Sequence, residues 1–284
     1  MRVLVLGASG MLGSAILRFF SISPGYQVFG SLRSSSALRF LPKTLHPVLS
    51  VIGDIDDQAK VKELIAEVKP EVVINCIGLV KHIVNDKEPL QAINVNSTFP
   101  HRLAILCEQY SCRLIHIGTD CVFSGEKGMY TEVDKSDAFD LYGRTKSLGE
   151  VDYPHAITLR TSIIGHELNS SSSLIDWFLK QEVSIKGYKK AIFSGLPTLE
   201  LARIIRDYVI PHPHLRGVYN VSAAAISKYD LLSLVSKIYN KKTVIYPDEQ
   251  VEVNRSLDSN KFCAATGYVA PSWPELIKLM YANK

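Results

Sequence analysis

Three residues carry side chains whose types and spacing suit proton transfer at a carbonyl or alcohol: Thr119, Tyr142 and Lys146. Tyr142 and Lys146 are four residues apart in a segment that is predicted to be helical, so both project from one face. A phenol with an ordinary pKa of about 10 is a poor acid–base catalyst at neutral pH, but a nearby ammonium favours its ionised form. Thr119 directly follows a predicted strand, where its hydroxyl could orient the reacting oxygen.

A glycine-rich turn near the start of the chain predicts a dinucleotide site. Gly7, Gly10 and Gly13 follow the apolar run Val3–Leu6 and open a helical pattern. Gly7 allows the tight turn, Gly10 lets the backbone approach a pyrophosphate, and Gly13 permits close packing of helix on strand. This GxxGxxG spacing is the short-chain dehydrogenase variant of the fingerprint. The predicted cofactor contacts of the turn are Gly7, Ser9, Gly10, Met11 and Leu12.

The ends of the next strands predict how the rest of the cofactor is held. An NAD enzyme often has an acidic residue after the second strand, but this chain has Arg33 there, close to Ser31 and Ser34. A cation with a hydroxyl could hold a 2′-phosphate, which favours NADP(H) over NAD(H). Asp54 and Ile55 are predicted to bracket the adenine after the third strand. Cys76, Ile77 and Gly78 are predicted to pass beneath the cofactor after the fourth.

These residues must be positioned by a parallel sheet covered on both faces. Continuous apolar strands alternate with helices along the first part of the chain, which is typical of a doubly wound α/β fold. We expect a Rossmann-like domain over residues 1–164, with a returning segment near residues 217–240. Most of residues 165–284 should form a smaller C-terminal cap that binds substrate. The expected elements include strands at 2–6, 72–76, 113–118, 156–161 and 217–221, and helices at 11–20, 58–68, 89–110, 142–150, 199–209 and 228–239.

Composition excludes several other classes of protein. The 284 residues carry a formal net charge of +4 with no Lys/Arg-rich block, so we expect no nucleic-acid partner. No apolar run reaches the length of a membrane span, so no membrane is expected. The five cysteines are scattered, as are the eight histidines, which predicts neither a disulfide framework nor a metal site. A reducing cytoplasm is the expected compartment.

Four segments together resemble the dTDP-4-dehydrorhamnose reductase family of extended short-chain dehydrogenases. They are GASGMLG at 7–13, the stretch from Glu88-Pro89 through Asn96 to Pro100, IGTDCVFSG at 117–125 and YGRTKSLGE at 142–150. The resemblance implies that Thr119, Tyr142 and Lys146 are catalytic. It further implies that Asn96 supports the backbone at the cofactor site and that Thr161 flanks the nicotinamide. Residues implied on the substrate side are Asp120, Cys121, Val122, Phe123, Ser194 and Arg255.

The expected reaction is therefore NAD(P)H-dependent reduction of a nucleoside-diphosphate 4-keto-6-deoxy sugar, in polysaccharide or deoxysugar biosynthesis. Related dehydratases carry an Asp–Glu pair after the threonine, and this chain has Asp120-Cys121, so the glutamate that a dehydratase needs is missing. An epimerase or epimerase/reductase that uses Cys121, with His166 as a candidate partner, remains an alternative. A second alternative is a non-catalytic NADP-binding regulatory subunit, like the methionine adenosyltransferase β subunit. A homodimer is an expectation from the family.

Overall fold

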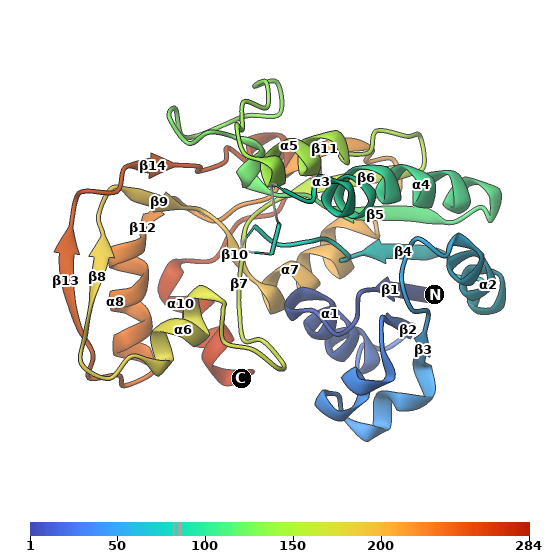
Figure 1. Ribbon diagram of the computed structural model, residues 1–284, viewed down its shortest axis with the longest axis horizontal. Helices are drawn as coiled ribbons and strands as arrows, with labels where there is room; N and C mark the ends of the chain where they lie inside the picture. Colours follow the sequence, from blue (N-terminus) through green and yellow to red (C-terminus); the bar gives the residue numbers. More distant parts are fainter. Residues whose placement is uncertain (82, 85–86) are drawn as a thin grey trace.

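The computed structural model describes residues 1–81, 83–84 and 87–284, and its centre is a seven-stranded parallel sheet (Figure 1). The strand order is β11-β6-β5-β4-β1-β2-β3, with every neighbouring pair parallel. The order reverses between β1 and β4, which is where α/β sheets bind ligands. This confirms the predicted Rossmann-like fold. The strands are β1 (Arg2–Leu6), β2 (Gln27–Leu32), β3 (Leu49–Val51), β4 (Val72–Asn75), β5 (Arg113–Ile117), β6 (Ala156–Arg160) and β11 (Gly217–Asn220).

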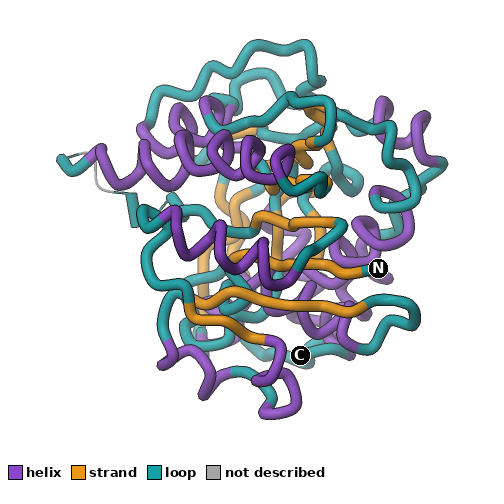
Figure 2. The backbone as a smooth tube through the Cα atoms, turned by 90° about the vertical axis from the view of Figure 1, so that its right-hand side faces the viewer, coloured by secondary structure: helices purple, strands orange, loops and turns teal. Residues whose placement is uncertain are grey.

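The apolar strands are explained by burial on both faces. In β1, Val3 and Val5 point into one core cluster, whereas Leu4 and Leu6 point into another, and none of the four is exposed. Side chains alternate along a strand, so a strand that is covered on both sides needs apolar residues at every position. Figure 2 shows the strands in the middle of the molecule with helices on both sides.

Each face of the sheet is covered by its own helices. The first core cluster contains residues of α1 (Met11–Ser21), α7 (Thr198–Ile204) and α10 (Trp273–Ala282). The second contains residues of α2 (Gln58–Val68) and α4 (Phe99–Gln109). The predicted helix 89–110 is continuous, but it passes from α3 (Pro89–Ala92) through a π-helical segment, Ile93–Thr98, into α4. Asn96 lies in that π-helical segment, a feature that often marks functional sites.

Most of the later elements form a second layer beside the sheet, on the left in Figure 1. β13 pairs with β8 in one small sheet, and β9 lies between β12 and β14 in another. A third pair, β7 with β10, links this region to the end of β6. The bounds are β7 (Ile163–Ile164), α6 (Leu174–Lys180), β8 (Ser184–Tyr188), β9 (Ala191–Phe193), β10 (Leu196–Pro197), β12 (Ile226–Ser227), α8 (Lys228–Ile238), β13 (Val244–Asp248), β14 (Val253–Asn254) and α9 (Asn260–Thr266).

Some segments beyond residue 164 pack against the first part of the chain. β11 adds to the sheet beside β6, and α7 packs against α1. α8, in contrast, packs on β8, β12 and β13. The domain division near residue 164 stays a prediction; α7 and β11, which follow it in the chain, pack on elements that precede it. Within the described residues, no helix is both long enough and apolar enough to cross a membrane.

Candidate active site

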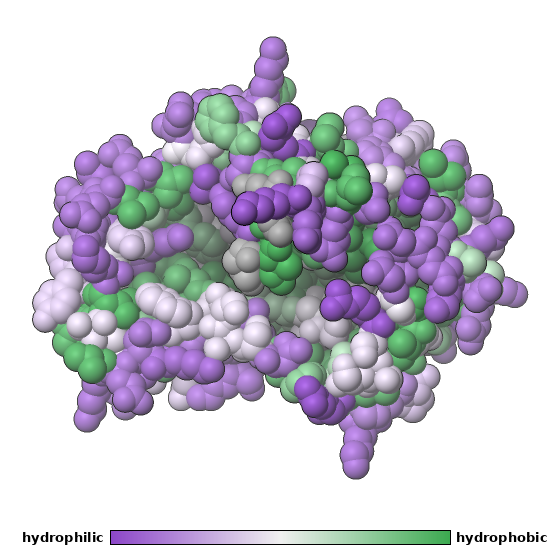
Figure 3. All heavy atoms as spheres, viewed as in Figure 1, coloured by the Kyte–Doolittle hydropathy of each residue, from purple (hydrophilic) through white to green (hydrophobic). Residues whose placement is uncertain are grey.

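A cavity of about 620 Å³ lies at the carboxyl edge of the sheet, and in the view of Figure 3 the surface is hollowed between the two layers. Its wall combines the glycine turn and the segments that follow β4, β5 and β6 with α5 (Leu141–Leu148) and the loop before α6. The sequence-predicted residues on this wall are Gly10, Met11, Leu12, Cys76, Ile77, Gly78, Thr119, Asp120, Cys121, Tyr142, Lys146 and Thr161. The topology therefore brings most of the candidates into one site.

The glycine turn has the geometry that a bound phosphate needs. Gly7 has a φ of +80°, a backbone conformation that favours glycine. A Cβ on Gly13 would lie 2.2 Å from the carbonyl oxygen of Gly7, so only glycine lets α1 start this close to β1. A Cβ on Gly10 would meet only the Gly7 carbonyl oxygen, at 3.4 Å. The backbone of Gly10 is thus open toward the cavity and fits an approaching anion.

Lys146 is a buried ammonium at the floor of the cavity. Its side chain projects from α5, the residue is 5% exposed, and Nζ donates a 3.0 Å hydrogen bond to the carbonyl oxygen of Ile117. Burial lowers the pKa of Lys146 to about 8, because desolvation disfavours the charged form. An ammonium has three donors. The remaining donors fit the hydroxyls of a ribose, so the residue suits a nucleotide ligand in this cavity.

Tyr142 and Thr119 meet one helical turn away from Lys146. Burial raises the pKa of Tyr142, the neighbouring Cys121 adds to the shift, and a hydrogen bond with Thr119 opposes it. The Thr119 hydroxyl also accepts from the N–H of Cys121 at 3.2 Å and lies 3.3 Å from Oδ1 of Asp120. The Tyr142 phenol is therefore protonated at neutral pH and able to donate a proton to an oxygen bound beside Thr119.

Asp120 and Cys121 form the floor on the other side of Tyr142. Asp120 is 6% exposed, and burial raises its pKa. Burial and the Asp120 charge raise the pKa of the Cys121 thiol to about 12. A thiol with so high a pKa is a poor base at neutral pH. Cys121 thus lines the cavity beside Tyr142, and its thiol is protonated there.

Asn96 acts on the site through the backbone. Its Oδ1 accepts from the N–H of Leu79 at 2.9 Å, and its Nδ2 lies 3.4 Å from the hydroxyl oxygen of Thr145. These bonds tie the segment after β4 to α5. Asn96 is fully buried and holds Gly78 and Leu79 in place without reaching the cavity wall.

Several predicted residues do not reach the cavity. Val122 and Phe123 are fully buried in a small apolar cluster with Tyr130 and Leu257, so their side chains face away from any substrate. Ser194 is 2% exposed, and its hydroxyl accepts from the N–H of Leu257 at 3.0 Å. The other predicted residues that do not line the wall are Gly7, Ser9, Arg33, Asp54, Ile55, Asn96 and Arg255.

The adenine-side candidates are split between core and surface. Ile55 is 9% exposed and belongs to a core cluster, whereas Asp54 is exposed and accepts from the N–H of Asp56 at 3.2 Å. Arg33 is exposed, and no partner is present for it in the described part of the chain. Ser31 is buried, where its hydroxyl accepts from the N–H of Gly7 at 3.1 Å. Of the two serines near Arg33, only Ser34 is exposed.

The sequence matches the family described as RmlD substrate binding domain over residues 1–283. The chain belongs to this family. It is 35% identical over 180 residues to the "Probable low-salt glycan biosynthesis reductase Agl14" of Haloferax volcanii, which covers 62% of this chain and 57% of that relative. It is 31% identical over 252 residues to methionine adenosyltransferase 2 subunit beta of Rattus norvegicus, covering 84% of this chain and 72% of the relative.

The fold of this RmlD-family protein is also that of a solved reductase. The dTDP-4-dehydrorhamnose reductase of Bacillus anthracis in complex with NADP superposes with a TM-score of 0.80 at 21% identity, and 99% of each chain is covered. At this identity the likeness describes the fold. Among the described residues of the RmlD-family chain, no group of three or more His, Cys, Asp or Glu side chains could hold a metal ion.

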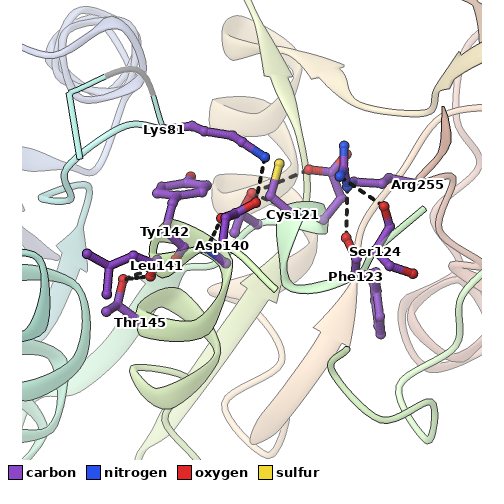
Figure 4. A network of polar contacts seen from close by, with 12 residues as sticks. Lys81, Cys121, Phe123, Ser124, Asp140, Leu141, Tyr142, Thr145 and Arg255 are labelled. Carbon is purple, nitrogen blue, oxygen red and sulfur yellow. Dashed lines mark hydrogen bonds and ion pairs between the residues drawn. The ribbon is translucent and has the colours of Figure 1, made fainter. Parts of the chain in front are cut away.

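Sequence reasoning missed an ion pair at the mouth of this RmlD-family site. Lys81 Nζ lies 2.7 Å from Oδ2 of Asp140, whose Oδ1 caps α5 by accepting from the N–H of Gly143 at 2.8 Å. Figure 4 shows Lys81 reaching past Tyr142 toward Asp140 and Cys121. Arg255 approaches from the opposite side, donating to the carbonyl oxygens of Phe123 and Ser124 at 2.8 and 2.9 Å. No local pattern marked Lys81, since its partner is 59 residues away.

His166 does not serve Cys121. Its two ring nitrogens lie 2.6 Å from Asp176 Oδ1 and 2.9 Å from the hydroxyl of Tyr239. Both nitrogens are therefore engaged by other residues. The expectation that His166 partners the thiol is wrong, because the turn after β7 directs the ring toward α6 and α8.

Proposed function

We propose that this protein reduces the keto group of a nucleoside-diphosphate 4-keto-6-deoxy sugar, using NAD(P)H, in glycan or deoxysugar biosynthesis. The observation that carries the proposal is the shared wall of one cavity, where Thr119, Tyr142 and Lys146 lie beside the open backbone of the glycine turn. The family match and the glycan biosynthesis reductase among its relatives support the same substrate class.

In this proposal each side chain has a separate role in the reduction of the substrate carbonyl group. A bound nicotinamide supplies the hydride. Thr119 orients the substrate carbonyl by hydrogen bonding, and Tyr142 gives its proton to the oxygen that becomes the alcohol. Lys146 binds the ribose hydroxyls, and its positive charge stabilises the phenolate that Tyr142 leaves behind. Asp120 and Cys121 contact the sugar on the far side of Tyr142.

We further propose NADP(H) as the preferred cofactor, held at its 2′-phosphate by Arg33 and Ser34. Arg33 follows β2 and is exposed, and no acidic residue stands in its place. An acid there would bind the ribose hydroxyls of NAD instead. The five free cysteines suit a reducing compartment, so we expect the protein to act in the cytoplasm.

The deciding experiment follows NADPH and NADH consumption at about 340 nm, the absorbance of the reduced nicotinamide that is lost on transfer, with a panel of nucleotide-linked 4-keto-6-deoxy sugars. Tyr142→Phe should lower kcat by about 10² to 10⁴-fold while cofactor binding persists, because only the proton donor is lost. Tyr246→Phe, at an exposed position of β13, is the matched control and should retain wild-type turnover. Cofactor binding without oxidation by any ketosugar would contradict the reductase.

One observation favours a second candidate. A relative that matches 84% of this chain at 31% identity is named methionine adenosyltransferase 2 subunit beta, a name that describes a subunit and not a reductase. A regulatory role predicts cofactor binding that Tyr142→Phe leaves unchanged, no ketosugar turnover, and co-purification with a methionine adenosyltransferase catalytic subunit. The Thr119, Tyr142 and Lys146 side chains on one cavity wall weigh against it, because a subunit that only binds the cofactor need not keep all three.

A further inference from the structure

Asp176, in the first turn of α6, ties together both ends of the loop between β7 and α6. Its Oδ2 accepts from the N–H of Glu167 at 2.7 Å. The Ser173 hydroxyl lies 3.2 Å from that oxygen and 3.2 Å from the carbonyl oxygen of Gly165, so it donates to one of them. The Glu167 carboxylate in turn accepts from the N–H of Ser173 at 2.9 Å. The two ends of the loop, residues 165–167 and Ser173 (its neck), are therefore held together by hydrogen bonds to the Asp176 and Glu167 carboxylates.

The same carboxylate anchors the loop to the cap through His166. The ring lies 2.6 Å from Asp176 Oδ1 through Nδ1 and 2.9 Å from the Tyr239 hydroxyl through Nε2. Burial, followed by the Asp176 charge, raises the pKa of Tyr239, so its hydroxyl stays protonated. A ring that donates from Nδ1 to Asp176 and accepts at Nε2 from Tyr239 satisfies all three groups. Tyr239 follows α8 and packs edge-on against Tyr281 of α10, 4.8 Å between ring centroids.

The tip of the loop presents hydroxyl groups to the cavity. Ser170 and Ser172 line the same cavity as Gly10 and Gly13, and both are exposed. Neither hydroxyl has a hydrogen-bond partner in the described part of the chain. Ser171, between them, is turned to another partner, since its hydroxyl accepts from Lys180 at 2.6 Å. Alternate residues of the tip therefore point into the cavity with donors to spare.

We propose that the segment Leu168–Ser172 completes the dinucleotide site, with the hydroxyls of Ser170 and Ser172 donating to the diphosphate that is seated on the glycine turn. Asp176 is the positioning residue that holds this segment in place through His166, Glu167 and Ser173. The inference rests on the proposed function only in taking a dinucleotide as the occupant of the cavity. The cap segment would then cover the side of the bound diphosphate that the glycine turn leaves open.

The test measures the Kd of NADPH directly, by calorimetry or by fluorescence of the bound dihydronicotinamide, together with Tm. The double variant Ser170→Ala/Ser172→Ala should raise Kd about tenfold or more with Tm unchanged, because two donors to a charged group are lost from an exposed segment. Asp176→Asn should raise Kd to a similar extent, since its NH₂ group would face the N–H donors of the neck.

Asp230→Asn is the matched control for the structural part of the Asp176 effect. Asp230 has the same place in α8, where its Oδ2 accepts from the Ser227 hydroxyl at 2.6 Å and its N–H donates to Ser227 Oγ at 3.0 Å, but it does not line the cavity. It should lower Tm as Asp176→Asn does and leave the Kd of NADPH within about twofold, because only a helix cap is weakened.

Two outcomes would overturn the inference. One is a Kd of NADPH within twofold of the wild type for the double serine variant. The other is an unchanged Kd of NADPH with weaker binding of dTDP, UDP or GDP, which would place the hydroxyls on the substrate. Both readouts are independent of turnover. NADPH binding that depends on this loop, without reduction of any ketosugar, would support the inference and contradict the proposed reductase activity.

Discussion

The ammonium group of Lys146 donates a 3.0 Å hydrogen bond to the carbonyl oxygen of Ile117, the last residue of β5. This bond joins the helix that carries Tyr142 to the strand that leads into Thr119. The three proposed catalytic side chains thus come from two elements that a buried charge also bridges. Burial of that charge has consequences for both the rate and the stability of the protein.

The first prediction concerns the pH dependence of reduction. Because burial lowers the pKa of Lys146 to about 8, the ammonium is present below that pH and lost above it. The value of kcat/KM for reduction should therefore be constant in the neutral range and fall above about pH 8. Lys146→Arg stays charged, so its residual activity should show no such fall. A wild-type rate that holds to pH 10 would contradict the role of Lys146.

Stability should change in the opposite direction from activity. The folded-state pKa of about 8 lies below the ordinary 10.5, so the unfolded chain binds more protons between these pH values. The wild-type free energy of unfolding should rise with pH across that window, and the cost of the buried charge is fully present below pH 8. Lys146→Met should therefore raise the free energy of unfolding at pH 7 by about 1 to 3 kcal/mol while abolishing turnover. Lys60→Met, on the surface, serves as the control in denaturant titrations.

Two glycines of the turn should respond differently to alanine. Gly13→Ala places a Cβ 2.2 Å from the Gly7 carbonyl oxygen, so α1 must shift, at a cost of about 1 to 3 kcal/mol in the free energy of unfolding. Gly10 has a φ of −75° and no such close contact, so Gly10→Ala should fold normally but weaken NADPH binding. Thermal unfolding and direct titration separate the two effects. Equal losses of Tm in both variants would argue against a packing role for Gly13 and a cofactor-binding role for Gly10.

Cofactor preference should depend on Arg33. Arg33→Ala should raise the KM for NADPH about 10- to 100-fold and leave that for NADH nearly unchanged, because a hydrogen-bonded charge pair with the 2′-phosphate is lost. Arg39→Ala removes a nearby exposed charge that stacks on Phe40, which controls for the general loss of positive potential. Similar changes for both cofactors would show that Arg33 does not read the 2′-phosphate.

The role of Cys121 can be separated from that of Tyr142. Since the pKa of the thiol is raised to about 12 and His166 is bonded elsewhere, Cys121→Ala should keep reduction within about threefold of the wild type, as expected for a residue outside the proton transfer. Incubation of the sugar in D₂O should give no thiol-dependent incorporation of deuterium. Exchange that is lost in Cys121→Ala and kept in Tyr142→Phe would instead establish the epimerase.

The sequence was most informative where the information is local. The glycine turn between β1 and α1 and the Tyr142–Lys146 spacing lie within a few residues each, so sterics and helical periodicity determine them directly. The strands of the sheet could be predicted because burial on both faces leaves a continuous apolar run. α9 is not among the expected helices, since seven residues with one fully buried side chain, Phe262, give no helical period.

Tertiary structure alone decided which side chains share the cavity. Val122 and Phe123 follow Thr119 closely, yet they turn into a core cluster with Tyr130 and Leu257. Lys81 and Asp140 meet across 59 residues, and His166 and Tyr239 across 73. Such pairs leave no periodic trace along the chain, because their proximity is set by how the helices and the cap pack onto the sheet. The sequence by itself therefore determined the chemistry available to this protein, and packing determined which groups can use it together.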